Sequence, residues 1–184
     1  YMKYKTIIFA LCVWMAGTLS AQSVYPGQFA GKMKLNTVAP VKVESFDLQD
    51  VRLLPSRFRD NMLRDSVWMT SIDVNRLIHS FRTNAGIWAG REGGYMTVKK
   101  YGGWESLDCE LRGHTTGHLL SAYGLMYAAT GSEIFKLKGD SIVTELGKVQ
   151  DALGNGYLSA FPEELINRNI KGQSVWAPWY TLHK

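Results

Sequence analysis

The stretch LRGHTTGHLLSAYGLMYAATG, residues 111–131, decides the predicted fold. From His118 to Ala129 nearly every residue is apolar or small, which predicts a helix that is buried all round. Thr130 to Glu133 then has the order of a capping box, which predicts the start of a second helix. That helix is expected to stop at Gly154 to Gly156, and its apolar residues recur at helical spacing: Ile142, Leu146, Val149 and Leu153. The two segments together predict a helical hairpin.

The segments on either side of this hairpin also favour helices. Residues 56–86 have apolar positions at close to helical spacing, with an interruption at Ser71 or Asp73 and a stop at Gly86. Further upstream, Val41 to Leu54 alternates in a β-prone manner, which predicts a short strand or an extended arm. After the hairpin, an aromatic loop leads into one more helix. Because strands are scarce, we predict an all-α fold of helical hairpins that present loops at one end.

The first 21 residues have the layout of a secretory signal peptide. Lys3 and Lys5 precede an apolar stretch from Thr6 to Gly17, and the small residue Ala21 stands before Gln22. The apolar stretch is short for a membrane span, although a membrane anchor is the alternative. We therefore expect a periplasmic or secreted protein with no stable membrane span after signal cleavage.

The rest of the chain divides into two predicted parts. Residues 22–44 form an extended arm, and residues 45–184 form a helical domain. The sequence WAPWYTLHK at its end carries no helix stop signal, so we expect the chain to be the N-terminal part of a longer protein.

Composition and charge exclude some classes of function. The chain is 46% hydrophobic and 20% charged, as in globular proteins. Its net charge is +5, or +5 − 2 = +3 without Lys3 and Lys5, and its basic residues are mixed with acidic ones, which argues against a nucleic-acid partner. Cys12 lies in the leader, and the remaining Cys109 is expected to be a small buried apolar residue.

His114 and His118 lie four residues apart and so share one helix face. A zinc-protease motif would place a glutamate beside the first histidine, where Thr115 and Thr116 stand instead. A zinc site also needs a third ligand, which no neighbouring residue supplies. The pair can instead hydrogen-bond near the helix start, or face a substrate cleft. Glycines at 113 and 117 favour the cleft, because they leave room beside the histidines.

Aromatic residues gather in the predicted loops and at helix starts. Sugar rings stack on aromatic faces, and their hydroxyl groups need polar partners, so this combination is typical of a sugar cleft. The alternative is that each tryptophan fastens a loop to the core. The predicted aromatic contacts to substrate are Trp104, Tyr157 and Trp179, with Trp176 and Tyr180 nearby.

Glycoside hydrolysis generally uses a pair of carboxylates. Two acidic clusters can be candidates, although most such residues are surface charges: Glu105, Asp108 and Glu110, and Glu163 and Glu164.

Four motifs, in order, resemble the catalytic domain of glycoside hydrolase family 127 and its close relative family 146, which are β-L-arabinofuranosidases. The motifs are NRLIHSFRTNAG, GGWESLDCELRGHTTGHLLSAYGLMYAATG, LGNGYLSAFPEE and VWAPWYTLHK. The resemblance spans about Ser45 to Lys184. It implies an (α/α)6 barrel, of which this chain is the N-terminal portion. It also implies an exo-acting, retaining enzyme that removes terminal arabinofuranose from plant glycans, so the expected partner is an arabinose-containing oligosaccharide or polysaccharide.

The resemblance also implies chemistry that these motifs do not contain. The family's nucleophile is a cysteine held in a zinc site of cysteines and a glutamate, and a zinc-bound thiol is ionised. These residues belong to a later part of the family's domain, and Cys109 does not match the nucleophile's position. We therefore expect zinc in the full-length protein but no metal ligand or catalytic residue in these residues, and a chain that is inactive alone. His183 matches a position that resembles a substrate-contacting histidine.

Two alternatives stay open. The chain can be a non-catalytic helical protein that binds carbohydrate or another surface, or a barrel that acts on another sugar, because fold does not settle substrate. An incomplete barrel should leave apolar helix faces such as Leu119–Tyr123 partly uncovered, so the isolated chain is expected to aggregate or to stay partly molten.

Overall fold

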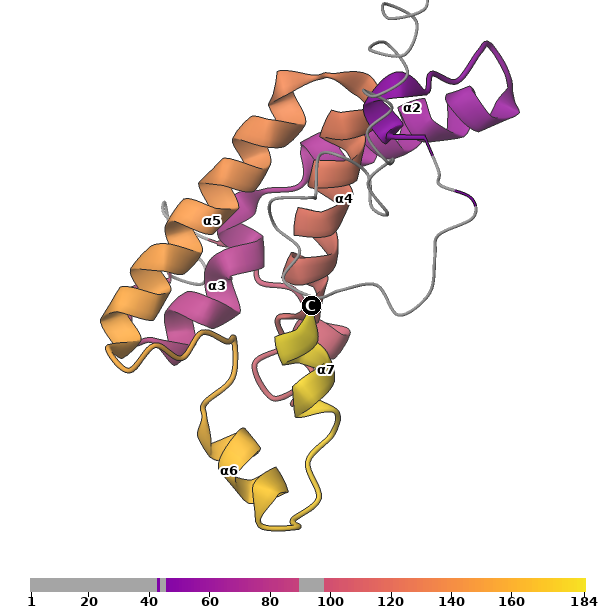
Figure 1. Ribbon diagram of the computed structural model, residues 1–184. Helices are drawn as coiled ribbons and strands as arrows, with labels where there is room; N and C mark the ends of the chain where they lie inside the picture. The colour runs from indigo at the N-terminus through magenta and orange to yellow at the C-terminus, as the bar shows by residue number, and fades with distance from the viewer. Residues whose placement is uncertain (1–42, 44–45, 90–97) are drawn as a thin grey trace, which may run out of the picture. The chain divides into compact units, whose positions relative to one another are not determined.

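The computed structural model describes residue 43 and residues 46–89 and 98–184 (Figure 1). The chain divides into two units, residues 1–46 and residues 47–184, and the description below concerns the second. The predicted signal peptide lies outside the described residues, as does almost all of the predicted arm.

All regular structure in the described residues is helical, which confirms the all-α prediction. It is consistent with the N-terminal part of an α/α barrel. The part of the predicted strand that is described, residues 46–54, contains a 3-10 turn, η2 (Leu48–Asp50), and no strand. The other elements are α2 (Arg57–Ser71), α3 (Val74–Asn84), η3 (Gly103–Glu105), α4 (His114–Thr130), α5 (Glu133–Leu153), α6 (Glu164–Ile170) and α7 (Pro178–His183). None of the described helices is both long enough and apolar enough to cross a membrane.

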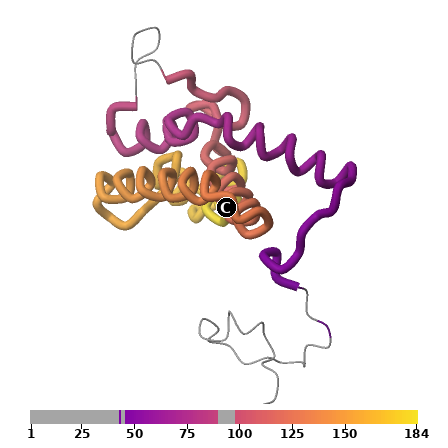
Figure 2. Tube along the Cα trace, turned by 90° about the horizontal axis from the view of Figure 1, so that it is seen from above, coloured from indigo at the N-terminus to yellow at the C-terminus, as the bar shows by residue number. Residues whose placement is uncertain are grey.

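Helices α3, α4 and α5 enclose the main core. Figures 1 and 2 show α5 running alongside α3, and α4 packs against α5 as the predicted hairpin. Tyr123 is almost completely buried between them, and its hydroxyl group donates a hydrogen bond to the Met69 carbonyl at 3.0 Å. The buried residues of this core are Met69, Ile72, Leu77, Ile78, Phe81, Leu119, Tyr123, Phe135, Ile142, Val149 and Ala160.

The observed helix boundaries agree with the predicted ones where a local sequence signal, such as a capping residue or a glycine, begins or ends a helix. The interruption falls at Ile72 and Asp73, and the Asp73 side chain accepts a hydrogen bond from the Asn75 amide at 2.9 Å, as an N-cap does. Helix α5 ends at Leu153 because Gly154 takes a left-handed conformation with φ of 74°.

Two details of the predicted hairpin are wrong. Thr130 is the last residue of α4 rather than the cap of α5, and its hydroxyl group donates to the Met126 carbonyl at 2.6 Å. The N-cap of α5 is Ser132, which makes no side-chain capping bond. Helix α4 is also not buried all round, because Leu125 is 58% exposed.

The apolar face that the sequence led us to expect uncovered is in fact covered. Leu119 and Tyr123 are both buried in the core that α3 and α5 complete. Exposed large apolar side chains lie on several other elements, and those on α2 include Phe58, Val67 and Trp68.

A second, smaller core holds α6 and the segment that leads to α7. It consists of Phe161, Leu165, Ile166 and Val175, with Tyr157 packed against it. Two side chains bind the carbonyl groups of residues 159–161, the segment in which the main core and the second core meet. The Asn84 amide donates to the carbonyls of Ser159 at 3.1 Å and Phe161 at 3.0 Å. The Arg112 guanidinium donates to the Ala160 carbonyl at 2.8 Å, and burial lowers the pKa of Arg112.

Candidate functional site

Glu105 connects the turn η3 to the start of α4. One carboxylate oxygen accepts from the Gly113 amide at 2.7 Å, and the other accepts from the Thr115 amide at 2.9 Å. Gly113, the N-cap residue, has no side chain to offer, so the carboxylate satisfies amides that would otherwise lack a partner. The negative charge also suits the positive end of the helix dipole. Glu105 therefore fixes the first turn of α4, from which both histidines project.

The two histidines lie in contact on one face of α4. Their rings are 5.9 Å apart and perpendicular. His114 is buried, with Nδ1 lying 2.9 Å from Glu105 Oε1 and 3.1 Å from the Leu111 carbonyl. His118 is exposed, and its Nε2 lies 2.9 Å from the Tyr180 hydroxyl. Each histidine thus has a defined polar partner contributed by a different segment.

Aromatic rings surround this pair. The Trp104 ring is 5.9 Å from the His114 ring and 5.8 Å from the Trp176 ring, and Tyr180 is 6.1 Å from His114. Trp104 is 61% exposed and Trp176 is 50% exposed, so both rings present surface to solvent. We call Trp104, His114, His118, Trp176 and Tyr180 the aromatic–histidine cluster.

Glu110 holds the Trp176 end of this cluster in place. Its carboxylate accepts from the Trp176 amide at 2.7 Å and lies 3.9 Å from the Arg168 guanidinium. Leu111 holds α7, because its carbonyl accepts from the Thr181 hydroxyl at 3.0 Å. The segment between η3 and α4 therefore anchors Trp176 and α7.

Two glycines make these close approaches possible, but not by leaving room for a ligand. A Cβ at Gly113 would lie 2.7 Å from Ala160 Cβ, and one at Gly117 would lie 2.9 Å from Lys184 Cβ and overlap the Lys184 backbone. The chain itself occupies the space that the sequence led us to assign to a substrate. The glycines serve the packing of α4 against its neighbours.

Three of the predicted site residues lie outside the cluster contacts described above. Tyr157 packs in the second core, with its hydroxyl group donating to the Phe161 carbonyl at 3.0 Å. The Trp179 indole N–H donates to Asn169 at 2.7 Å. His183 is exposed in the last turn of α7.

Tyr157 gives a testable pH dependence. Burial raises its pKa to about 12 from an ordinary value of 10.0. In an absorbance titration, we expect Tyr157→Phe to remove one ionisation step near pH 12. Because the pKa in the folded state lies above the unfolded value, the stability that Tyr157 contributes is complete below about pH 10 and is lost as the pH rises toward 12. An unchanged alkaline titration in the variant would contradict this assignment.

Sequence reasoning named Glu105 and Glu110 only as possible acids and missed their structural contacts. Glu105 lies eight residues before Gly113, and Glu110 lies 66 residues before Trp176. No local pattern marks a side chain that caps a helix across a loop, or one that binds an amide so far along the chain. No sequence pattern predicts that the Leu111 carbonyl accepts hydrogen bonds from Thr181 and His114.

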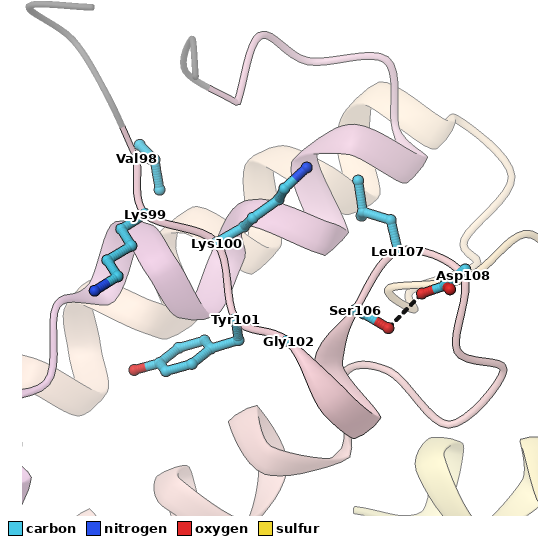
Figure 3. Close-up of a pocket in the computed structure, with 8 residues that line it drawn as sticks. All are labelled: Val98, Lys99, Lys100, Tyr101, Gly102, Ser106, Leu107 and Asp108. Carbon is cyan, nitrogen blue, oxygen red and sulfur yellow. Dashed lines mark hydrogen bonds between the residues drawn. The ribbon is translucent and has the colours of Figure 1, made fainter. Parts of the chain in front are cut away.

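An open pocket of about 680 Å³ lies beside η3. Its lining residues are Val98, Lys99, Lys100, Tyr101, Gly102, Ser106, Leu107 and Asp108 (Figure 3). Gly102 and Ser106 flank the turn that carries Trp104 and Glu105. Residues that line the pocket are therefore sequence neighbours of a residue of the aromatic–histidine cluster. Ser106 and Asp108 are hydrogen-bonded to each other, and this bond lowers the pKa of Asp108.

The metal-ligating side chains of the described residues do not come together in one place. In residues 46–89 and 98–184, no three His, Cys, Asp or Glu side chains are grouped so that they could hold a metal ion. His114 and His118 already contact Glu105 and Tyr180, and Cys109 is a free, half-buried thiol. The zinc that the resemblance implies therefore has no ligand set in these residues.

A model of a known protein family matches most of the chain. Residues 50–184 match the family model described as Beta-L-arabinofuranosidase, GH127 catalytic domain. The match confirms the resemblance to family 127 and does not extend to family 146. It covers α2 to α7 and every residue of the aromatic–histidine cluster. No curated protein matches the chain.

Proposed function

This chain belongs to the GH127 catalytic-domain family of β-L-arabinofuranosidases, and we propose that it binds terminal β-L-arabinofuranose of plant-derived glycans for hydrolysis. Membership of the family makes the protein a glycoside hydrolase and its substrate a carbohydrate. The choice of arabinofuranose, the exo-acting and retaining mode of cleavage and the polymeric source are the finer parts of the proposal.

The aromatic–histidine cluster is the observation that carries this proposal. Trp104 and Trp176 stand perpendicular to each other with both rings exposed, so a sugar ring can stack on one face and be bounded by the other. His114 and His118 add polar atoms beside the indoles. An apolar wall with a few fixed polar groups is the usual composition of a small-ligand site.

The chemistry of bond cleavage is proposed to come from other residues of the protein. By resemblance to the family, the cysteine nucleophile and its zinc ligands are proposed to lie in a later part of the domain. When bound there, zinc would keep the cysteine sulfur ionised and ready to attack the anomeric carbon. Within this proposal the present chain orients the sugar, and Cys109 is not the nucleophile.

Export is the remaining part of the proposal. The charged and apolar leader before Gln22 supports a periplasmic or secreted enzyme. An exported enzyme can reach plant glycans.

The test is hydrolysis of a nitrophenyl β-L-arabinofuranoside by the full-length protein with zinc and a thiol present. We expect turnover by the wild type, and a loss of about tenfold or more in kcat/KM for His114→Ala and His118→Ala, since each removes a polar contact in the site. Zinc content should stay unchanged in both variants. The matched control is His79→Ala, which removes a histidine of α3 and is expected to retain activity.

Four outcomes would contradict the proposal. Wild-type protein that loads zinc but does not cleave the substrate would disprove the activity, and binding of arabinose without cleavage would support a carbohydrate-binding protein instead. Loss of zinc from either histidine variant would show that His114 and His118 are metal ligands. Robust turnover by residues 22–184 alone would show that the nucleophile lies within them.

A further inference from the structure

We propose that Glu105 is a positioning residue that holds the proton of His114 on Nδ1, so that Nε2 is left to accept a hydrogen bond from a sugar hydroxyl group. The inference rests on the proposed function for the identity of the ligand. Its geometric part, the choice of tautomer, stands independently of any activity.

The neighbours of His114 Nδ1 determine where the proton lies. Glu105 Oε1 is 2.9 Å from Nδ1, and the Leu111 carbonyl oxygen is 3.1 Å from it. Neither oxygen carries a proton, so the proton must lie on Nδ1. Nδ1 donates its hydrogen bond to the Leu111 carbonyl, and the Glu105 carboxylate lies close enough to stabilise that proton by its charge. In a neutral imidazole the other nitrogen then carries a lone pair and no proton.

Glu105 is fixed firmly enough to enforce this choice. Its two oxygens also accept from the amides of Gly113 and Thr115, and its side chain is only 12% exposed. The carboxylate cannot rotate away from His114 without leaving helix amides unpaired, which is costly in a buried position. The tautomer is therefore coupled to the start of α4.

His114 Nε2 is available to a ligand. Within residues 46–89 and 98–184, Nε2 has no hydrogen-bond partner, and the His114 side chain keeps 10% of its surface exposed. The imidazole lies within about 6 Å of the Trp104 and Tyr180 rings, between centroids. An acceptor beside aromatic faces suits a hydroxyl group that donates from a stacked sugar.

His118 does not share this arrangement. Its Nε2 lies 2.9 Å from the Tyr180 hydroxyl, so that nitrogen already has a partner on α7. The two histidines of the motif thus differ in role. His114 presents a free acceptor whose state Glu105 sets, whereas His118 connects α4 to α7.

The experiment uses the full-length protein with 15N-labelled histidine and measures the nitrogen chemical shifts of His114 at a pH where the ring carries one proton. We expect the Nδ1–H tautomer to dominate in the wild type. In Glu105→Gln the negative charge beside Nδ1 is lost and the Leu111 carbonyl alone remains to hold its proton, so we expect the population of the Nδ1–H tautomer relative to the Nε2–H tautomer to fall at least tenfold. We also expect kcat/KM to fall by about 10- to 100-fold, as when the hydrogen-bond partner of a ligand-binding histidine is removed. His114→Gln assigns the signals among the four histidines.

The matched control is Glu110→Gln, which removes a carboxylate that also accepts from a backbone amide in this region but contacts Trp176 rather than His114. It should leave the tautomer of His114 unchanged. An Nε2–H tautomer in the wild type, or the same ratio in Glu105→Gln, would overturn the proposal, and the wild-type measurement decides it even if the variant fails to fold. A wild type with the expected tautomer but no arabinofuranosidase activity would refute the proposed function and leave the positioning role intact.

Discussion

Gly113→Ala is expected to destabilise the fold by about 3 kcal/mol or more. Gly113 has φ of 97°, a backbone conformation that costs an alanine about 1–2 kcal/mol. The added Cβ would also lie 2.7 Å from Ala160 Cβ and 3.1 Å from the Phe81 ring. Overpacking of this kind costs about 1–3 kcal/mol, because core side chains cannot move freely. The change would also disturb the amide that Glu105 accepts from.

Gly156→Ala is the matched control for that effect. Gly156 has φ of 81°, but a Cβ there would meet no heavy atom within 4 Å. We expect a loss of only about 1–2 kcal/mol, due to the backbone alone. Urea unfolding gives the free energy of unfolding of both variants. Equal losses would show that the side chains of Ala160 and Phe81 move aside at little cost, which would contradict the expected overpacking.

Gly117→Ala is expected to displace the end of α7 and to disrupt the site. Its Cβ would overlap the Lys184 backbone, which cannot be accommodated by a side-chain rotation. Gly117 directly precedes His118, and Lys184 follows Tyr180 by four residues. Moving Lys184 away from Gly117 should therefore break the hydrogen bond between His118 and Tyr180. A misplacement of about 1 Å in a site can cost on the order of 100-fold in activity, so we expect kcat/KM to fall by at least tenfold.

The control for this change lies on the same helix. A Cβ at Gly124 would meet no heavy atom within 4 Å, so Gly124→Ala should stabilise α4 by about 0.5–1 kcal/mol through helix propensity alone. The two variants should therefore shift the thermal midpoint in opposite directions. A stabilising Gly117→Ala with unchanged activity would contradict the close approach of α7.

Helices were predictable from the sequence where their signals are local. The spacing of Ile142, Leu146, Val149 and Leu153 and the glycine at 154 define α5 and its end without reference to any other segment. The same holds for the Asp73 cap between α2 and α3. The resemblance of four motifs to family 127 was also sufficient to identify the family.

Predictions that depended on tertiary packing were less successful. Thr130 has the sequence of a cap, but α4 continues through it because its hydroxyl group bonds within the preceding turn. Whether Leu119 or Leu125 is covered depends on where α3 and α5 lie, which helical spacing does not specify.

The candidate site shows the same division. His114, His118 and Trp104 were predicted from their residue types and are in contact. The role of Glu105 was not predicted, because a side chain that caps a helix across a loop is recognisable only when the loop has closed.

The hydrogen bond from Thr181 to the Leu111 carbonyl has a consequence for the order of folding. It spans 70 residues, whereas the turn between α4 and α5 needs only Gly131 and Ser132. Contacts between distant residues form slowly because loop closure costs entropy, and local hairpins form fast. During synthesis, the α4–α5 hairpin can be complete before α7 leaves the ribosome. The nascent chain therefore acquires its core first, and the aromatic–histidine cluster is completed only when Thr181 arrives.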